Sequence, residues 1–183
     1  MKKFVFIARA GQGAKSAANI LAKAAFLQGL NVQEFPEYGP ERMGAPVKSY
    51  VKIGNKKIRD FSPITKADYV VLIDKTLINL ALGLDLKDSI LIINDVCDAE
   101  KYYKKYKINA KIGVVNASKI SFKNIGLDKP SIPMLGAVLS FEKMVKNDSI
   151  NRAVREYFEG FGKKNVVDSN IKAIKECYEG VNK

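Results

Sequence analysis

The chain has 183 residues, of which 47% are hydrophobic, enough for one domain with a sizeable core. Lysine and arginine total 31 against 19 aspartate and glutamate, so the formal net charge is +12. Such a charge attracts polyanions or acidic proteins. The basic residues are scattered, however, and no helix-turn-helix, zinc-finger or RNA-recognition motif accompanies them, so we expect no nucleic-acid partner.

The chain contains no histidine, and its two cysteines, Cys97 and Cys177, do not form a CxxC pair. These residues provide no ligand set for a metal ion or an iron–sulfur cluster, and we expect two buried, reduced thiols. Without histidine, any catalysis by this chain alone would rest on carboxylates or lysines. The apolar stretch before Arg9 is too short for a signal peptide, and none is long enough to span a bilayer. We therefore expect a cytoplasmic protein without a membrane partner.

The N-terminal region predicts a βαβ unit. Residues 4–8 form a continuous apolar run, which is typical of a strand buried on both faces. Residues 14–28 repeat apolar and small side chains at helical spacing, and Gly29 ends this helix. Residues 31–35 indicate a second strand. This order of elements with short joints is typical of a parallel sheet.

The rest of the chain predicts further strands and helices around the same sheet. Residues 47–53 alternate apolar and polar side chains, and Gly54-Asn55 can turn the chain toward residues 57–59, so we expect an antiparallel hairpin at a sheet edge. Other strands are expected at 69–73, 89–93 and 112–115. Helices are expected near 77–84, 100–107, 133–145, 149–161 and 168–178. We therefore predict a single α/β domain over residues 1–183, a three-layer α/β/α structure with a mixed, mostly parallel sheet and C-terminal helices.

The Gly11-x-Gly13 turn between the first strand and the first helix is a candidate phosphate site, because backbone N–H groups and the positive end of a helix dipole meet there. It is not a Walker A loop, because Ala14 separates Gly13 from Lys15-Ser16. A free-standing dinucleotide-binding oxidoreductase is the alternative, with Glu34 at the spacing of a ribose-binding acid. A tight turn that only packs helix against strand is a third interpretation.

Residues 35–46, with the sequence FPEYGPERMGAP, hold three of the six prolines and two glycines between two predicted strands. Proline fixes the backbone and glycine allows close approach, and loops of this length tend to be functional. The loop is either a preformed wall of a ligand or subunit site or a rigid structural Ω-loop. Tyr38 within it can stack on a ligand or simply pack.

Three stretches occur in this order along the chain: ARAGQGAKSA at 8–17, FPEYGPERMGAP at 35–46 and PMLGA at 133–137. Taken together, they resemble the gamma subunit of the 2-oxoacid:ferredoxin oxidoreductases, most closely that of pyruvate:ferredoxin oxidoreductase (pyruvate synthase). Residues 170–180 add the Asn…Ala…Tyr-Glu-Gly pattern that closes the gamma subunits of the family.

The resemblance implies an assembly that converts a 2-oxoacid, coenzyme A and oxidised ferredoxin to acyl-CoA, carbon dioxide and reduced ferredoxin. Its partners would be alpha, beta and delta subunits, with ferredoxin or flavodoxin as electron acceptor, in anaerobic metabolism. Thiamine diphosphate, Mg and [4Fe–4S] clusters would lie on those other subunits. This chain would have no catalytic residue; it would be structural and share in holding coenzyme A, a substrate, at the subunit interface.

Coenzyme A is a polyanion, and the glycine turn and the proline loop offer groups for it. Arg42 can fork onto a phosphate, or it can form a salt bridge that only fixes the loop. Glu41 would pair with Arg42 or with a neighbouring subunit. If both loops lie at the carboxyl edge of the sheet, they face one crevice. The expected site residues are Arg9, Gly11, Gln12, Gly13, Lys15, Glu41 and Arg42.

Overall fold

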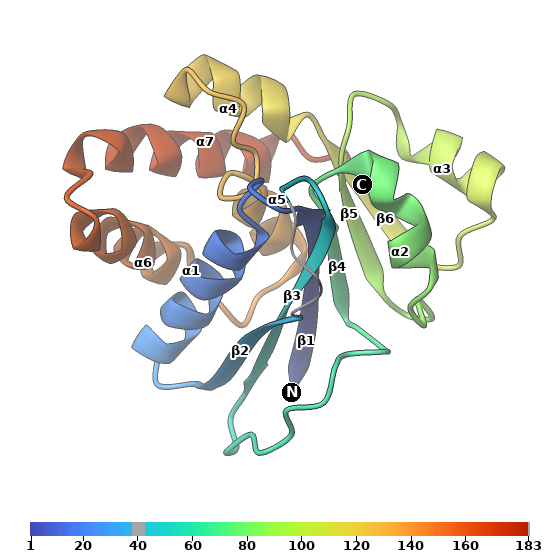
Figure 1. The fold of residues 1–183 in the computed structure, drawn as a ribbon, viewed down its shortest axis with the longest axis horizontal. Coiled ribbons are helices and arrows are strands. Elements are labelled where there is room, and N and C mark those ends of the chain that lie inside the picture. The colour runs from blue at the N-terminus through green and yellow to red at the C-terminus, as the bar shows by residue number, and fades with distance from the viewer. Residues whose placement is uncertain (38–42, 183) are drawn as a thin grey trace.

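The computed structural model describes residues 1–37 and 43–182. They form a six-stranded sheet with helices on both faces (Figure 1), which confirms the three-layer α/β/α fold. The strands are β1 (Lys2–Arg9), β2 (Asn31–Glu37), β3 (Pro46–Gly54), β4 (Tyr69–Leu72), β5 (Ile90–Asn94) and β6 (Lys111–Val115). The helices are α1 (Ala14–Leu27), α2 (Ile78–Leu82), α3 (Ala99–Tyr106), α4 (Ala117–Ile125), α5 (Met134–Phe141), α6 (Asn147–Gly160) and α7 (Val167–Glu179), with short 3-10 turns at Lys75–Leu77 and Lys164–Val166.

The strand order is β2-β3-β1-β4-β5-β6. Strands β1, β4, β5 and β6 are parallel neighbours, whereas β3 is antiparallel to both β1 and β2. Because β3 is antiparallel to both of its neighbours, β2 and β1 run in the same direction. The sheet is therefore mixed and mostly parallel, as the sequence predicts, and the carboxyl ends of β1 and β2 lie at one edge.

The predicted hairpin after Gly54 is wrong. Residues 57–59 form no strand, and β3 pairs along its length with β1 on one side and β2 on the other. The alternating pattern suggested a solvent-exposed edge, but two of its polar side chains, Ser49 and Lys52, are buried. Pairing with two long strands buries more backbone than a local turn could, so the long-range partners determine the place of this strand.

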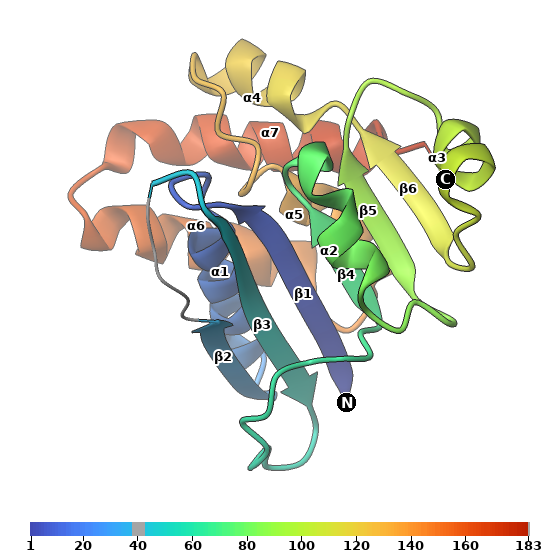
Figure 2. The same ribbon diagram turned by 45° about the vertical axis from the view of Figure 1, so that its right-hand side comes forward.

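Two apolar clusters fill the spaces on either side of the sheet. Phe4 and Phe6 of β1 face the cluster under α1, α5 and α6, whereas Val5 and Ile7 face the cluster under α2 and α3. Successive side chains of a strand point to opposite faces, so a strand covered on both sides needs a continuous apolar run. Figure 2 shows the two helical layers with β1 between them.

Helix α4 was not expected from the sequence. It follows β6 directly, and the side chain of Asn116 accepts a hydrogen bond from the N–H of Lys119 at 3.0 Å. An asparagine at this place is a standard start signal for a helix. The asparagine start signal was present, but the apolar side chains of the segment have too weak a helical periodicity for the helix to be predicted.

Helix α5 lies in the centre of the C-terminal helices, and every residue from Met134 to Ser140 is buried. Gly136 allows α7 to approach closely, because a Cβ atom at this position would lie 1.8 Å from the carbonyl oxygen of Ile174. The PMLGA stretch is therefore a packing motif between two helices.

Candidate functional site

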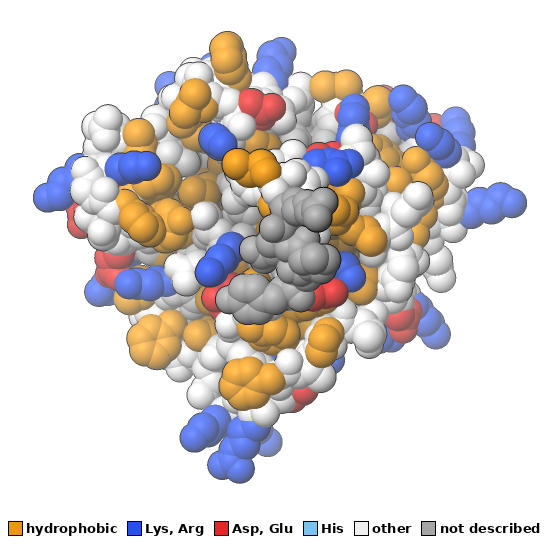
Figure 3. All heavy atoms as spheres, in the orientation of Figure 1, with side chains coloured by type: hydrophobic (Ala, Val, Ile, Leu, Met, Phe, Trp, Pro, Cys, Tyr) orange, Lys and Arg blue, Asp and Glu red, His pale blue; other side chains and the backbone are white. Residues whose placement is uncertain are grey.

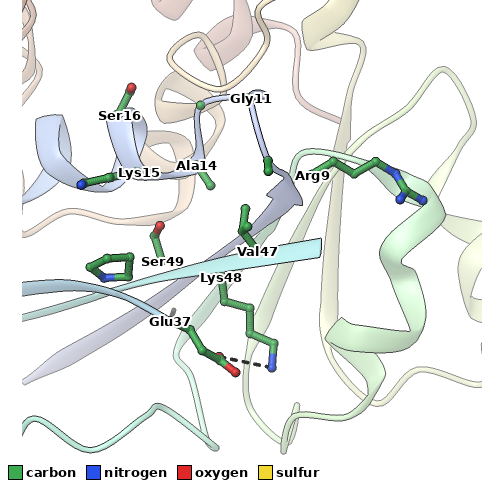
Figure 4. Close-up of a pocket in the computed structure, with 12 residues that line it drawn as sticks. Arg9, Gly11, Ala14, Lys15, Ser16, Glu37, Val47, Lys48 and Ser49 are labelled. Carbon is green, nitrogen blue, oxygen red and sulfur yellow. Dashed lines mark ion pairs between the residues drawn. The ribbon is translucent and has the colours of Figure 1, made fainter. Parts of the chain in front are cut away.

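A cavity of about 360 Å³ lies where the β1–α1 turn, the end of β2 and the start of β3 meet (Figure 4). The N–H of Ala10 donates to the carbonyl of Ala45 at 2.8 Å, and the N–H of Gly44 donates to the carbonyl of Ala10 at 3.4 Å. The glycine turn and the described ends of the proline loop are therefore side by side, at the carboxyl edge of the sheet where the sequence predicts a shared crevice.

Both glycines of the turn have left-handed backbone angles, with φ of +94° at Gly11 and +89° at Gly13. Gly13 also has no room for a side chain, because a Cβ atom there would lie 2.5 Å from the Oγ of Ser131. Gly13 is the N-cap of α1, and no side chain caps this helix end. The first amides of α1 therefore have no side-chain cap, and they lie at the positive end of the helix dipole, which is the arrangement that favours an anion.

The side chains of Arg9 and Gln12 are used to hold the turn in place. The Nη1 of Arg9 donates to the carbonyl of Gly44 at 3.1 Å, its Nη2 donates to the Oγ1 of Thr76 at 2.9 Å, and its Nε lies 3.2 Å from a carboxylate oxygen of Asp74. The Nε2 of Gln12 donates to Asp74 at 3.0 Å, and its Oε1 accepts from the N–H of Arg9 at 2.7 Å. Figure 4 shows the Arg9 guanidinium directed away from the helix start. The guanidinium of Arg9 therefore pairs with groups of this chain that hold the turn in place.

Asp74 is the centre of this network at the end of β4. Burial opposes its ionisation, but hydrogen bonds from Thr76 and Gln12 and the charge of Arg9 outweigh burial and hold the pKa of Asp74 below its usual range. The carboxylate is thus charged at neutral pH and anchors the turn to the neighbouring strand.

Two lysines line the cavity. Lys15, in the first turn of α1, is exposed and has no ion-pair partner among the described residues. Lys48 of β3 lies 3.6 Å from a carboxylate oxygen of Glu37, which also accepts a hydrogen bond from Tyr50. The sequence did not indicate Lys48, because its place beside Glu37 follows from the pairing of β2 with β3. The cavity therefore offers the cation of Lys15, unpaired in residues 1–37 and 43–182, together with helix amides, whereas Lys48 is paired with Glu37, which also lines the cavity.

Glu34, the acid required by a dinucleotide site, does not line this cavity. Burial raises its pKa above the ordinary value, although the charge of Lys15 partly opposes this, and its Oε1 is buried without a hydrogen-bond partner. A ribose-binding acid must present its carboxylate to the ligand, but Glu34 lies outside the cavity with its Oε1 buried. The geometry of Glu34 therefore favours the phosphate interpretation over the dinucleotide interpretation.

Glu41, Arg42 and Tyr38 lie outside the described residues, and the roles expected for them stay predictions. The described residue nearest to them on the C-terminal side is Met43, and a Cβ atom at Gly11 would lie 3.4 Å from its sulfur. Among the described residues, no group of His, Cys, Asp and Glu side chains could hold a metal ion. No helix in the same residues is long and apolar enough to cross a membrane.

Comparison with known proteins assigns the chain to a family. The family model for pyruvate ferredoxin/flavodoxin oxidoreductase matches residues 3–180. The "Pyruvate/ketoisovalerate oxidoreductases common subunit gamma" of Pyrococcus furiosus is 40% identical over 177 residues, covering 95% of this chain and 94% of that protein. The chain therefore belongs to the pyruvate ferredoxin/flavodoxin oxidoreductase family. Within it, the chain is a gamma subunit of a pyruvate or other 2-oxoacid oxidoreductase, which confirms the resemblance found in the sequence motifs.

Solved structures agree with this assignment. The crystal structure of the pyruvate oxidoreductase subunit PORC of Thermotoga maritima has a TM-score of 0.85 and 39% identity, covering 99% of this chain and 97% of that one. A 2-oxoglutarate:ferredoxin oxidoreductase of Magnetococcus marinus, solved with 2-oxoglutarate, coenzyme A and succinyl-CoA bound, contains the same fold, with a TM-score of 0.81. At 13% identity, covering 97% of this chain and 30% of that chain, the second likeness concerns the fold alone.

Proposed function

We propose that this gamma subunit contributes part of the coenzyme A site of its oxidoreductase. The observation that carries the proposal is the uncapped start of α1 behind Gly13, opening on a cavity lined by Lys15 and Lys48. A phosphate group of coenzyme A would accept hydrogen bonds from the first amides of α1, and Lys15 would balance its charge, because Lys48 is already paired with Glu37.

The site residues expected from the sequence then divide into two roles. Gly11, Gly13 and Lys15 would face the phosphate directly. Arg9 and Gln12 would act as positioning residues, because their side chains tie the turn to Asp74. Arg42 and Glu41 would complete the site from the proline loop, with Arg42 forking onto a second phosphate.

The fold of the Magnetococcus marinus enzyme supports the proposal in a general way, because a chain with this fold belongs to an oxidoreductase that was solved with coenzyme A. Because this likeness concerns the fold alone, the roles of individual residues are argued from the geometry of the cavity. A turn that served only to pack α1 against β1 would need the two glycines but would have no need of an unpaired lysine at an open helix start.

The chemistry itself would take place on partner subunits, the alpha, beta and delta chains, in the cytoplasm. Those chains would hold thiamine diphosphate, Mg and the [4Fe–4S] clusters, and ferredoxin or flavodoxin would receive the electrons. This chain would contribute no catalytic residue. Copurification with larger subunits, followed by mass spectrometry and metal analysis, tests this division of roles.

The coenzyme A site is tested with Lys15→Ala in the assembled enzyme. Losing one exposed charge-assisted contact should raise the KM for coenzyme A about fivefold, with an unchanged KM for pyruvate and an unchanged kcat. Lys119→Ala is the matched control, because Lys119 is an exposed lysine in the first turn of α4 and does not line the cavity. Arg42→Ala should raise the KM for coenzyme A more than that for the oxoacid.

The result that opposes the proposal is an unchanged KM for coenzyme A in both Lys15→Ala and Arg42→Ala. The dinucleotide alternative makes its own prediction, since the isolated chain would then bind NAD or NADP saturably at micromolar concentration. Isothermal titration of the chain with both nucleotides separates the two functions.

A further inference from the structure

A second exposed feature lies at the opposite end of the sheet from the glycine turn. Residues 55–68 connect β3 to β4 without a helix or strand of their own, and Figure 2 shows this connection near the N-terminus, far from the β1–α1 turn. Connections of this length in a compact domain are uncommon and are often functional. We name residues 55–62 the basic loop.

The buried side chain of Lys52 in β3 fixes the basic loop to the sheet. Lys52 is 1% exposed, and its ammonium donates to the carbonyl of Asp60 at 2.7 Å, to the carboxylate of Asp60 at 2.8 Å and to the carbonyl of Ser62 at 2.9 Å. These three bonds use all the donors of an ammonium group. A buried charge is costly unless it is paired, so opening this turn would leave Lys52 unsatisfied.

Asp60 closes the same turn from the other side. Its second carboxylate oxygen accepts from the N–H of Ser62 at 2.9 Å. Hydrogen bonds from Lys52 and Ser62 hold the pKa of Asp60 well below its usual range, so the turn keeps its charged clamp at physiological pH. These bonds tie residues 60–62 to the sheet although the residues lie on the surface.

The clamp presents an aromatic ring among unpaired cations. Phe61, at the tip of the clamped turn, is 72% exposed. Lys56, Lys57 and Arg59 are exposed and have no ion-pair partner within the described part of the chain. Figure 3 shows lysine and arginine side chains gathered at the lower end of the molecule, where Figure 1 places this connection. An ordinary solvated loop would need neither the buried lysine nor the exposed ring.

We propose that the basic loop docks this gamma subunit onto an acidic face of another subunit of the oxidoreductase. Phe61 would enter an apolar socket, and Lys56, Lys57 and Arg59 would pair with carboxylates around it. An aromatic anchor held rigidly within a polar rim is the arrangement that contributes most to binding at protein interfaces. The net charge of +12 also favours an acidic partner.

A protein fits this surface better than a nucleic acid. Single-stranded nucleic acids bind grooves that offer several aromatic platforms in sequence, whereas the basic loop offers one ring on a projecting turn. The proposal rests on the assignment as a gamma subunit and does not depend on the coenzyme A site, which lies at the other end of the sheet.

The test uses the complete complex, with all subunits expressed together and an affinity tag on the gamma subunit. Phe61→Ala should weaken the affinity of the gamma subunit for the other subunits about thirtyfold. Combined Lys56→Glu, Lys57→Glu and Arg59→Glu should weaken it at least about tenfold and lower the salt dependence of what remains. The larger subunits retained on the tag are quantified after washes at rising salt concentration. All these side chains are exposed, so folding should not change.

The matched control is Phe161→Ala with Lys163→Glu and Lys164→Glu, which alters another exposed phenylalanine and two exposed lysines, after α6. Retention equal to wild type in the basic-loop variants, or an equal loss in the control, would overturn the proposal. If retention is unchanged and the basic-loop variants bind labelled single-stranded RNA more weakly, the loop binds a nucleic acid and the proposal is overturned. In the complex that still assembles at high subunit concentration, Phe61→Ala should leave the KM for coenzyme A unchanged, whereas Lys15→Ala should leave retention unchanged. Failure of one proposal is thus distinguishable from failure of the other.

Discussion

Gly136→Ala is a sharp test of how the C-terminal helices pack. Alanine in a helix interior is favoured over glycine by about 1 kcal/mol, so helix propensity alone predicts a more stable protein. The structure predicts the opposite. The added Cβ atom would lie 1.8 Å from the carbonyl oxygen of Ile174 and 2.8 Å from the backbone nitrogen of Tyr178, both of which belong to α7.

The magnitude follows from the movement that the methyl group demands. Carbon and oxygen atoms in contact lie about 3.4 Å apart or more, so α5 and α7 must separate by roughly 1.5 Å where they touch. Backbone atoms cannot rotate out of the way as a side chain end can. Overpacking of this kind costs about 3 kcal/mol, and the gain in propensity returns about 1, which leaves a net loss of about 2 kcal/mol in the free energy of unfolding.

Urea unfolding followed by circular dichroism measures this loss. With a slope of about 2 kcal/mol per molar urea, the midpoint for Gly136→Ala should fall by about 1 M. Gly160→Ala is the matched control, because Gly160 ends α6 and a Cβ atom there would meet nothing within 4 Å. Its midpoint should stay unchanged or rise slightly. If Gly136→Ala instead unfolds at the same or a higher urea concentration than wild type, the close approach of α5 and α7 is refuted.

Two further predictions concern titratable groups, one partly buried and one fully buried. Burial raises the pKa of Glu34 in the folded protein. Its protonated form therefore contributes to the free energy of unfolding in full below the pKa of the unfolded chain, and this contribution is lost as the pH rises through the folded pKa. Glu34→Gln should therefore raise the urea midpoint at pH 7.5 and change it little at pH 4; an equal effect at both pH values would contradict this. Burial also raises the pKa of the Cys177 thiol to about 12, whereas Cys97 is only half-buried. A thiol reagent at pH 8 should modify Cys97 alone until guanidinium exposes both, and rapid modification of two thiols in the folded protein would count against the burial of Cys177.

Much of the fold was predictable because local patterns report burial. The continuous apolar run at residues 4–8 became the central strand β1, and helical spacing near the C-terminus predicted α5, α6 and α7. The place of β3 was not predictable, because alternation in residues 47–53 indicates a strand but says nothing of its neighbours. Pairing between β3 and β1 joins residues far apart in the sequence, and no local signal encodes it.

The candidate site shows the same division. Gly11-x-Gly13 could be recognised as a glycine turn at the start of a helix, since strand, turn and helix are contiguous. Lys48 could not, because only the register of β2 and β3 brings it beside Glu37. That the Arg9 side chain contacts Asp74 could not be predicted either. Asp74 follows β4, which is far from Arg9 in the sequence and is brought beside it only by the pairing of β1 with β4.

From the sequence alone follow the family, the layered α/β class and the glycine turn, because ordered motifs and side-chain periodicity are properties of neighbouring residues. The tertiary structure decided which charges remain free for a partner. Arg9 is bound within the chain, Lys52 is buried to clamp a surface turn, and Lys15 is left open at the start of a helix. In the sequence these three basic residues cannot be told apart. Only the groups that folding places around each side chain determine whether its charge is paired within the chain or remains exposed to a partner.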